Sequence, residues 1–542
     1  MKTFSLAAFW FLSATAFAQD FDKTRKEFKE AVLAMNESAV ASAADKLVSS
    51  DNTGAVDALL DGYSLTAAQL KQLWAEKVRW IREADANSDI EWINGPTGST
   101  PAAGSMNRYL KLQEAQKEGQ RVEEKIMRIE SVKRRIVSAL ASFKSDAAVK
   151  SLVGKMKLDS NWDRRAGIAE ALGQIEHADA VPALVDRMKG DSEAGVKVAC
   201  LDAIRAKKAA TPEVVSAVCD QLRSDFWQVK YSAAITLKAL GSRDAIEPLI
   251  DTLKGVDGRL RHDINDVLVA LSGVDKHGDH AAWRAWFDTN KEAVVGGGYK
   301  PKDEEKPNAG NGRGTTFYGI PVKSKNVVFV IDCSGSMMWE SEWAVPTDVA
   351  TGSGGGADPY PKPNGNRKID IARWQLARCV AGIPDQTEFN IIFFSSGFEV
   401  MSEKMVKMTA ATRKQALAFV DRLQPEGGTN IFDPMEKAFT FTGSGDKLAK
   451  QSIDTIFLLT DGMPNQGQIP DASGILAKLK EMNKVKKITV NTIGVFSSNP
   501  PVPVQANEKE EGEKFLKQMS DDHGGVFVNA STGNKSGGGR KK

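Results

Sequence analysis

The first half of the chain repeats one apolar pattern at a nearly constant interval. Val153, Val185, Val218 and Ile250 recur at steps of 32 or 33 residues, each inside a helix that a short apolar pair opens. The four pairs are Ala148-Val149, Ala180-Val181, Val214-Val215 and Ala245-Ile246. Second helices are predicted between them, at 164–172, 197–206 and 231–240. A period of this length with two helices per unit predicts an α-solenoid over residues 128–292.

Helical patterns also fill the segment before this array. The apolar run at 55–60 has the form of an earlier repeat start, and residues 64–127 read as two long charged helices around a polar loop at 94–105. A helical hairpin or a short coiled coil is therefore predicted inside a helical region at 19–127.

Two features end the array. Trp283, Trp286 and Phe287 form a bulky apolar cluster, which suits the closing of the last repeat better than the binding of a ligand. Residues 293–320 then have the Gly, Pro, Asn, Lys and Glu content of a flexible linker, so a domain boundary is predicted there.

The pattern changes after the linker. Four apolar runs read as buried parallel strands, at 327–331, 389–394, 455–459 and 488–495. Helical segments alternate with them, at 368–382, 411–423, 433–442, 472–484 and 509–521. This alternation predicts a doubly wound α/β domain at 321–532, with its site at the carboxyl ends of the strands. The chain is thus predicted to be a multidomain protein, with an all-α solenoid before an α/β domain.

Polar residues gather at the ends of these strands and at the start of one helix. They are Asp332, Ser334 and Ser336 after the first strand, Thr429 before a helix, and Asp461 after a later strand. All five side chains offer oxygen, which suits Mg²⁺, or Mn²⁺ or Ca²⁺, better than zinc or copper. Each cluster alone is also compatible with ordinary turns and helix caps. Together they predict a site for a divalent cation.

In this order and context, the three clusters closely resemble the metal-ion-dependent adhesion site of the von Willebrand factor A (VWA) domain, a Rossmann-like fold, over about residues 325–530. The resemblance implies that Ser334 and Ser336 bind the metal directly, and that Thr429 binds it directly or through water. Asp332 and Asp461 would act through water or accept hydrogen bonds from bound groups. The solenoid resembles HEAT repeats more loosely, through its period and its helix pairing.

The connection after the first strand is longer than this family usually has. It covers residues 339–367 and would lie beside the metal, where a partner-selective lid is one interpretation. A disordered insertion without a role fits its composition nearly as well. The segment carries three large aromatic residues and four acidic ones, namely Trp339, Trp343, Tyr360, Glu340, Glu342, Asp348 and Asp358.

The N-terminus has the pattern of a secretory signal. One positive charge at Lys2 precedes an apolar stretch, and Ala16-Phe17-Ala18 supplies small residues for cleavage before Gln19. The apolar stretch is short for an uncleaved membrane anchor, which needs roughly 20 residues. A signal peptide at 1–18 and an exported protein, periplasmic or secreted, are therefore predicted. The Gly- and Lys-rich end at 533–542 is predicted to be a disordered tail.

Charge and cysteine content narrow the function classes. The 72 basic and 70 acidic residues give a formal charge of +2, which provides no field for nucleic acid. Four cysteines are too few for a disulfide framework. Cys200 and Cys219 fall on consecutive helices that a disulfide could join. Cys333 and Cys379 share one domain, where burial as small apolar side chains fits at least as well as a bridge.

No nucleophile paired with a general base stands out, so the chain is not expected to be an enzyme. His523 precedes two glycines at a helix end, where the helix dipole favours a cation, so a cap explains it better than catalysis. The leading hypothesis is a metal-dependent protein-binding protein outside the cytoplasm, whose cation coordinates an Asp or Glu of a partner. The alternative is an assembly scaffold whose repeats recognise the partner, while the metal only stabilises the C-terminal domain.

Overall fold

The computed structural model describes residues 5–87, 90, 92–95, 98–301, 315–341, 365–441, 453–497 and 507–530. For residues 5–18, 85, 92–95 and 98–99 it describes the backbone alone. The chain forms two compact units, Met1–Gln221 with Ile235–Ser242, and Leu222–Ala234 with Arg243–Lys542. Helix α10 (Trp227–Leu240) contributes to both.

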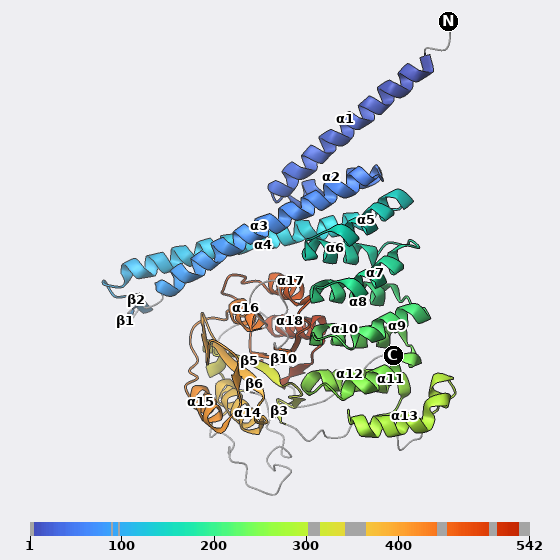
Figure 1. The fold of residues 1–542 in the computed structure, drawn as a ribbon. Helices are drawn as coiled ribbons and strands as arrows, with labels where there is room; N and C mark the ends of the chain where they lie inside the picture. The colour runs from blue at the N-terminus through green and yellow to red at the C-terminus, as the bar shows by residue number, and fades with distance from the viewer. Residues whose placement is uncertain are drawn as a thin grey trace. The chain divides into compact units, whose positions relative to one another are not determined.

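Four helices open the first unit, α1 (Ser5–Leu33), α2 (Glu37–Ser49), α3 (Thr53–Ala86) and α4 (Met106–Leu140). Helices α3 and α4 lie side by side as the predicted helical hairpin (Figure 1). Their connection was predicted as a loop, but it contains the antiparallel strands β1 (Trp92–Gly95) and β2 (Gly98–Pro101). The repeat-like start at 55–60 lies inside α3, so no break separates it from the hairpin.

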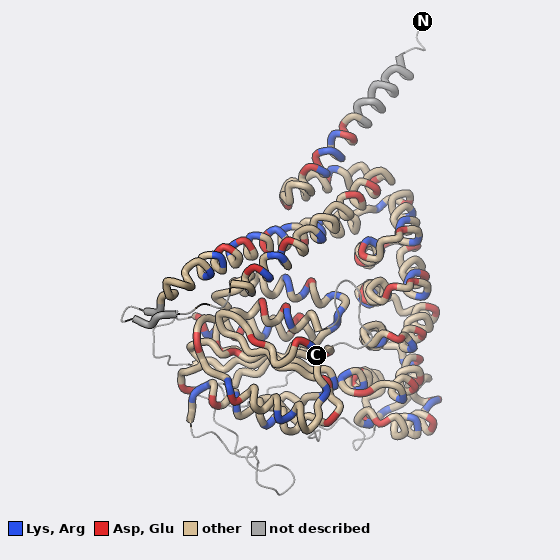
Figure 2. Tube along the Cα trace, turned by 60° about the vertical axis from the view of Figure 1, so that its left-hand side comes forward, with Lys and Arg blue, Asp and Glu red and all other residues tan. Residues whose placement is uncertain are grey.

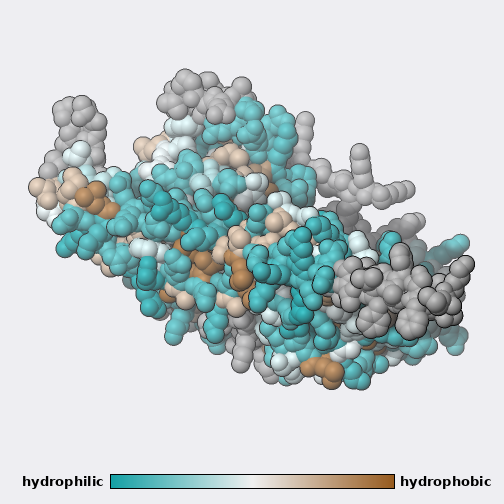
Figure 3. All heavy atoms as spheres, turned by 90° about the horizontal axis from the view of Figure 1, so that it is seen from above, coloured by the Kyte–Doolittle hydropathy of each residue, from teal (hydrophilic) through white to brown (hydrophobic). Residues whose placement is uncertain are grey.

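The hairpin is held by a small apolar cluster and is charged outside. Leu73 of α3 is buried with three residues of α4, Val122, Ile126 and Ile129. Basic and acidic residues are interspersed along both helices (Figure 2), so neither sign dominates. Seen from above, the described surface is mainly hydrophilic, with apolar residues in small separate groups (Figure 3).

The solenoid region consists of short helices joined by tight turns. Its helices in the first unit are α5 (Asp146–Leu158), α6 (Trp162–Leu172), α7 (Ala180–Gly190), α8 (Ala194–Lys207) and α9 (Pro212–Gln221). Those in the second unit are η1 (Arg243–Ala245), α11 (Ile246–Leu253), α12 (Gly258–Ser272) and α13 (His280–Val295). The predicted helix pairs are therefore present.

The repeated apolar positions are buried, with a shift of one residue in two copies. Val218 and Ile250 are buried as predicted. In the first two copies Leu152 and Leu184 are fully buried instead, and the predicted valines one residue later are half-buried. One residue turns the direction of a side chain by about 100° around a helix axis, so a small change in helix start selects the neighbouring position.

The aromatic cluster at the end of the array is buried, as expected of a cap. Trp283, Trp286 and Phe287 of α13 are all at most 5% exposed. The ring nitrogen of Trp283 donates to Asn265 Oδ1 at 2.8 Å, and that of Trp286 donates to the Tyr299 hydroxyl at 3.0 Å. Their polar atoms are therefore satisfied within the protein, which leaves no reason to assign a ligand to them.

The second unit contains the predicted α/β domain. Its main sheet has the order β11-β10-β9-β5-β6-β7, with β8 also paired to β6. The parallel strands are β5 (Asn326–Asp332), β6 (Glu388–Phe394), β9 (Thr455–Thr460), β10 (Thr489–Gly494) and β11 (Phe527–Asn529). Strands β7 (Phe398–Val400) and β8 (Val406–Lys407) are antiparallel to β6 and were not predicted.

Helices cover both faces of this sheet, which confirms the doubly wound fold class. Figure 1 shows α14 (Lys368–Gly382) and α15 (Ala410–Asp421) on one face. The other face is covered by α16 (Phe432–Thr440), α17 (Ala472–Asn483) and α18 (Glu508–Asp522). A short pair, β3 (Thr316–Phe317) and β4 (Ile320–Pro321), adds Phe317 and Ile320 to the buried core. The outer domain boundaries remain predictions.

None of the four cysteines forms a disulfide bond. Cys200, Cys333 and Cys379 are buried, and burial raises the pKa of each thiol above its usual range. Cys333 and Cys379 are therefore buried as small apolar side chains. Neither the Cys200–Cys219 disulfide nor the Cys333–Cys379 disulfide is formed. Within the described part of the chain, no helix is both long enough and apolar enough to cross a membrane.

Candidate metal centre

The two predicted acidic residues follow neighbouring strands of the sheet. Strand β5 ends at Asp332, and β9 ends at Thr460, directly before Asp461. From β5 the chain continues to β6 on one side, whereas β9 lies on the other side and leads outward to β10. Such a switch point opens a crevice at the carboxyl ends of the two central strands. The fold thus places both carboxylates where α/β proteins keep their sites.

Hydrogen bonds join four of the five predicted residues. Asp332 Oδ1 accepts from the Ser334 N–H at 2.6 Å, and the Ser334 and Ser336 hydroxyl oxygens lie 3.2 Å apart. Ser336 Oγ donates to Asp461 Oδ1 at 2.7 Å. Thr460 Oγ1 donates to Asp332 Oδ2 at 2.5 Å. The ends of β5 and β9 therefore meet through one continuous set of bonds.

The fifth predicted residue is held beside this group by its main chain. The Thr429 N–H donates to Asn465 Oδ1 at 2.9 Å, and the Thr429 carbonyl accepts from the Asn465 N–H at 3.0 Å. The same loop reaches the first cluster, because the Gly335 N–H donates to the Gly427 carbonyl at 3.0 Å. Gly427 has a φ of +68°, which L side chains rarely adopt. The three predicted loops thus converge.

Burial dominates the ionisation of Asp332. Burial raises its pKa to about 7, and the negative charge of Asp461 adds to this effect. Hydrogen bonds from Thr460 and Ser334 act in the opposite direction without cancelling it. A cation placed beside this carboxyl would favour the ionised form and lower that pKa.

A buried lysine, which was not predicted, completes the group. Lys368 is the first residue of α14 and is 1% exposed. Its Nζ donates to Asp461 Oδ2 at 2.6 Å and lies 5.0 Å from the centre of the Trp339 ring. The sequence does carry a signal for it. Arg367 and Lys368 place two cations at the start of a predicted helix, where the helix dipole disfavours positive charge.

The donor set fits a hard divalent cation. It offers carboxylate and hydroxyl oxygens, and the Ser334 and Ser336 oxygens lie 3.2 Å apart. Neighbouring ligands of an octahedral Mg²⁺ are separated by about 2.9 Å. Both oxygens of Asp332 already accept hydrogen bonds, which suits a carboxylate that acts through water. That these side chains hold a metal stays a prediction.

The long insertion at 339–367 leaves and returns beside these residues. The Ser341 N–H donates to the Asn366 carbonyl at 2.7 Å, and the Lys368 N–H donates to the Trp339 carbonyl at 2.9 Å. The two ends of the insertion are therefore fastened together next to Lys368. The rest of it lies outside the described residues, including Glu342, Trp343, Asp348, Asp358 and Tyr360. The lid interpretation stays a prediction.

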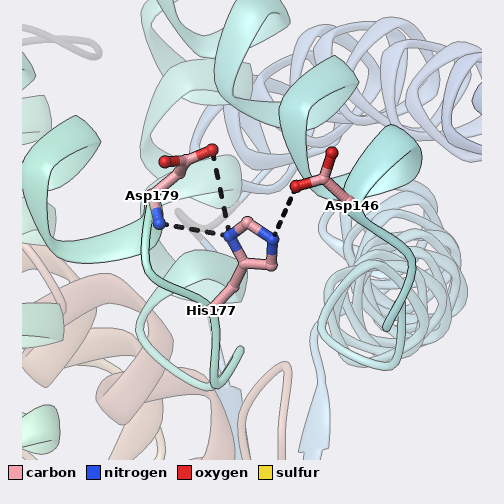
Figure 4. A group of neighbouring side chains, drawn as sticks. All are labelled: Asp146, His177 and Asp179. Atoms are coloured by element: carbon pink, nitrogen blue, oxygen red, sulfur yellow. Dashed lines mark hydrogen bonds and ion pairs between the residues drawn. The ribbon is translucent and has the colours of Figure 1, made fainter.

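The first unit contains another group of possible metal ligands (Figure 4). His177 Nε2 lies 3.3 Å from Asp146 Oδ1, while His177 Nδ1 accepts from the Asp179 N–H at 3.1 Å. The two carboxylates thus face different ring nitrogens, and one nitrogen is already used as an acceptor. Asp146 also pairs with Lys150 at 2.8 Å. One possible ligand atom of each residue lies within 4.8 Å of the others, but the observed contacts already join two helix starts, so no metal is assigned to this group.

His523 ends α18 as a neutral cap, not as the cation that the helix dipole led us to expect. Its side chain is buried, and burial lowers the pKa of the ring. Its Nδ1 lies 2.8 Å from the Met519 carbonyl oxygen. A hydrogen bond therefore satisfies the helix end without a charge.

Known protein families match both the helical repeats and the α/β domain of the chain. Residues 129–205 match the family described as HEAT repeats, and residues 229–255 match the PBS lyase HEAT-like repeat. Residues 327–463 match the von Willebrand factor type A domain. The HEAT matches lie within the predicted solenoid at 128–292, and the VWA match lies within the predicted α/β domain.

Individual relatives match only part of the chain. Inter-alpha-trypsin inhibitor heavy chain H4 of Homo sapiens is 31% identical over 153 residues, and inter alpha-trypsin inhibitor, heavy chain 4 of Mus musculus is 28% identical over 152 residues. Each match covers 28% of this chain but only 14% and 13% of the respective relative. The solved structure of a von Willebrand factor type A protein from Catenulispora acidiphila has a TM-score of 0.27 and 19% identity over 39% of each chain, and a score this low carries no argument. The family matches identify the parts: the chain contains HEAT repeats followed by a VWA domain.

Proposed function

We propose that this chain binds a partner protein through a divalent cation in its VWA domain, and that it does so outside the cytoplasm. The cation, most simply Mg²⁺ with Mn²⁺ or Ca²⁺ as substitutes, would be held by Ser334, Ser336 and Thr429, with Asp332 and Asp461 beside it. The bound cation would supply a coordination position for an Asp or Glu side chain of the partner. The proposed role is therefore binding of a partner and not catalysis of a reaction.

The observation that supports this proposal is the low negative charge of the site. With a cation bound, which favours ionised carboxyls, the two negative charges of Asp332 and Asp461 would be offset by the Lys368 ammonium, which bonds directly to Asp461. The remaining donors are neutral hydroxyls. A divalent cation in such surroundings keeps net positive charge, and a carboxylate from outside is the simplest group to neutralise it.

The rim of the site offers a surface for such a partner. Ser336, Gly428 and Gly462 are partly exposed, whereas Asp332 lies below them and is fully buried. Met338 follows in the short 3₁₀ turn η3 (Gly335–Met338) and is 46% exposed. A flexible apolar side chain beside a charged centre suits contact with partners of varied shape.

The extracytoplasmic location is inferred from the N-terminal sequence. One lysine, an apolar stretch and the small residues before Gln19 are the features of a signal peptide. N-terminal sequencing of the exported protein would test this part separately, and a chain that retains residues 1–18 would contradict it.

Metal and carboxylate binding can be tested on one purified protein. Mn²⁺ binding is measured by electron paramagnetic resonance for the unaltered chain and for Asp332→Asn, with Asp454→Asn as a control. Asp454 is also a buried aspartate of the VWA domain, but it lies at the opposite end of β9. We expect Asp332→Asn to weaken Mn²⁺ binding by about 10–100-fold, and Asp454→Asn to leave it unchanged.

The partner chemistry is tested with short peptides that carry a single Glu or, in the control, a single Gln. The Glu peptide is expected to bind only with Mn²⁺ or Mg²⁺ present, and EDTA should abolish binding. Peptide or partner binding that survives both EDTA and Asp332→Asn would contradict the proposal and favour the scaffold function, in which the repeats recognise the partner.

A further inference from the structure

The position of Lys368 opposes two general preferences. A lysine side chain is almost never fully buried unless it is paired, and the first turn of a helix repels positive charge. Lys368 is 1% exposed and opens α14. Local helix stability therefore does not explain the position of Lys368, and the groups around it must account for it.

Three contacts fix the lysine in place. Its backbone N–H donates to the Trp339 carbonyl at 2.9 Å, and its Nζ lies 5.0 Å from the centre of the Trp339 ring. The ammonium donates to Asp461 Oδ2 at 2.6 Å, while Asp461 Oδ1 accepts from Ser336 at 2.7 Å. One oxygen of the Asp461 carboxylate thus accepts from a lysine ammonium, and the other accepts from Ser336, a predicted metal ligand.

This arrangement has a direct electrostatic consequence. A fixed positive charge one side chain away from a divalent cation opposes its binding, and the opposition is strong where water is excluded. The same charge stabilises Asp461 beside the buried Asp332, because two ionised carboxyls without a nearby cation would repel each other. The lysine therefore helps the domain to fold and weakens the hold of the site on metal.

We propose that Lys368 is a built-in counter-cation of the metal site, which limits its affinity for divalent cations and keeps a bound cation dependent on a partner carboxylate. The inference rests on the proposed function and concerns how metal binding at that site is regulated. Affinity for metal and affinity for partner then oppose each other: removing the lysine charge strengthens the first and weakens the second.

The test replaces the charge with an apolar side chain of similar length, Lys368→Met. Lys478→Met is the matched control, because Lys478 lies on α17 of the same domain and is also 1% exposed. Mn²⁺ affinity is measured by electron paramagnetic resonance and by calorimetry on the full chain. We expect Lys368→Met to bind Mn²⁺ about tenfold more tightly or better, and Lys478→Met to bind it as the unaltered chain does.

A second readout is the single-Glu peptide with the Mn²⁺-loaded protein. Its affinity should fall by about tenfold in Lys368→Met, because the bound cation is left with less net positive charge. Equal or weaker Mn²⁺ binding by this variant, or unchanged peptide binding, would overturn the inference. An unaltered chain that binds no Mn²⁺ would instead overturn the proposed function itself, so the two failures are distinguishable.

Folding of the variant is measured in the same experiment. If Lys368→Met is unfolded without metal, its folding is followed by circular dichroism against Mn²⁺ concentration. Recovery at Mn²⁺ levels below those that saturate the unaltered chain supports the inference, since the metal then replaces the lysine charge. No recovery at saturating Mn²⁺ would show a purely structural ion pair and would overturn it.

Discussion

Among the residues that the structure describes, Lys77–Glu123 and Lys368–Asp461 are buried lysine–carboxylate pairs of nearly the same geometry in different surroundings. In the helical hairpin, Lys77 Nζ lies 2.7 Å from Glu123 Oε2 and 4.8 Å from the centre of the Trp74 ring. In the VWA domain, the corresponding distances of Lys368 are 2.6 Å to Asp461 and 5.0 Å to Trp339. All four charged side chains are at most 1% exposed. Pair geometry alone therefore does not separate a structural role from a functional one.

The surroundings do separate them. Lys77 and Glu123 lie within long helices, beside an apolar cluster that includes Leu73 and Val122. Lys368 instead opens a helix, and its partner Asp461 is linked through hydroxyl groups to a second buried carboxylate. The hairpin pair joins one charge of each sign beside apolar side chains, whereas the second pair is joined to another carboxylate and two hydroxyl groups, a set of oxygens that suits a further cation.

The largest expected effect is the loss of the hairpin pair. Glu123→Gln removes the carboxylate charge that lies 2.7 Å from the buried Lys77 ammonium, which should lower the local free energy of unfolding by about 3–5 kcal/mol. Hydrogen exchange measured by mass spectrometry on peptides from α3 and α4 reports this change. Because neither residue belongs to the predicted metal site, the loss should be the same in EDTA and in Mg²⁺.

A double replacement provides the control for the hairpin. Lys77→Met with Glu123→Leu removes both charges and keeps the volume, so most of the protection should return. A loss that depends on Mg²⁺, or a double variant as unstable as Glu123→Gln, would contradict the view of this pair as purely structural.

The pH dependence of the VWA domain is the next effect in size. The folded-state pKa of Asp332 is about 7, above the 3.8 of an exposed aspartate, so the folded domain binds a proton that the unfolded chain releases. The contribution of Asp332 to the stability of the folded domain is therefore greatest below about pH 4. As the pH rises to about 7, the free energy of unfolding falls by up to about 4 kcal/mol.

Thermal unfolding followed between pH 5 and pH 8 in EDTA checks this sign. The VWA transition should move to lower temperature as pH rises, and Mg²⁺ should reduce the shift because a bound cation favours the ionised carboxyl. Asp332→Asn removes the titrating group and serves as the control. A transition whose temperature rises with pH in EDTA, or an identical slope in Asp332→Asn, would contradict the assignment.

Patterns along the chain predicted most of the fold, because its elements are long and strongly periodic. The predicted helix at 368–382 matches α14, and the strand runs match β5, β6, β9 and β10. The edge strands β7 and β8 have three and two residues, too few to show an alternation.

The site could be predicted only in part, for a related reason. Asp332 and Ser334 stand in one short motif, so their proximity follows from the sequence. Lys368 is separated from Asp461 by 93 residues along the chain, and only the folded domain brings them together. The unfavourable charge at a helix start was the one local indication that this lysine has a partner elsewhere.

The smallest expected effect sharpens the comparison through the two tryptophan rings. Trp74→Leu and Trp339→Leu each remove a ring that faces a buried ammonium, which should cost about 0.5–2 kcal/mol of local stability in either region. Hydrogen exchange on α3 and on α14 measures the two losses side by side.

Only Trp339→Leu should also change metal binding, because only the lysine beside Trp339 bonds to a residue of the predicted site. A less firmly held Lys368 ammonium opposes the cation less, so Mn²⁺ should bind about two- to fivefold more tightly. Equal Mn²⁺ affinity in both variants would mean that the ring holds the lysine for stability alone, and that the two pairs are more alike than their surroundings suggest.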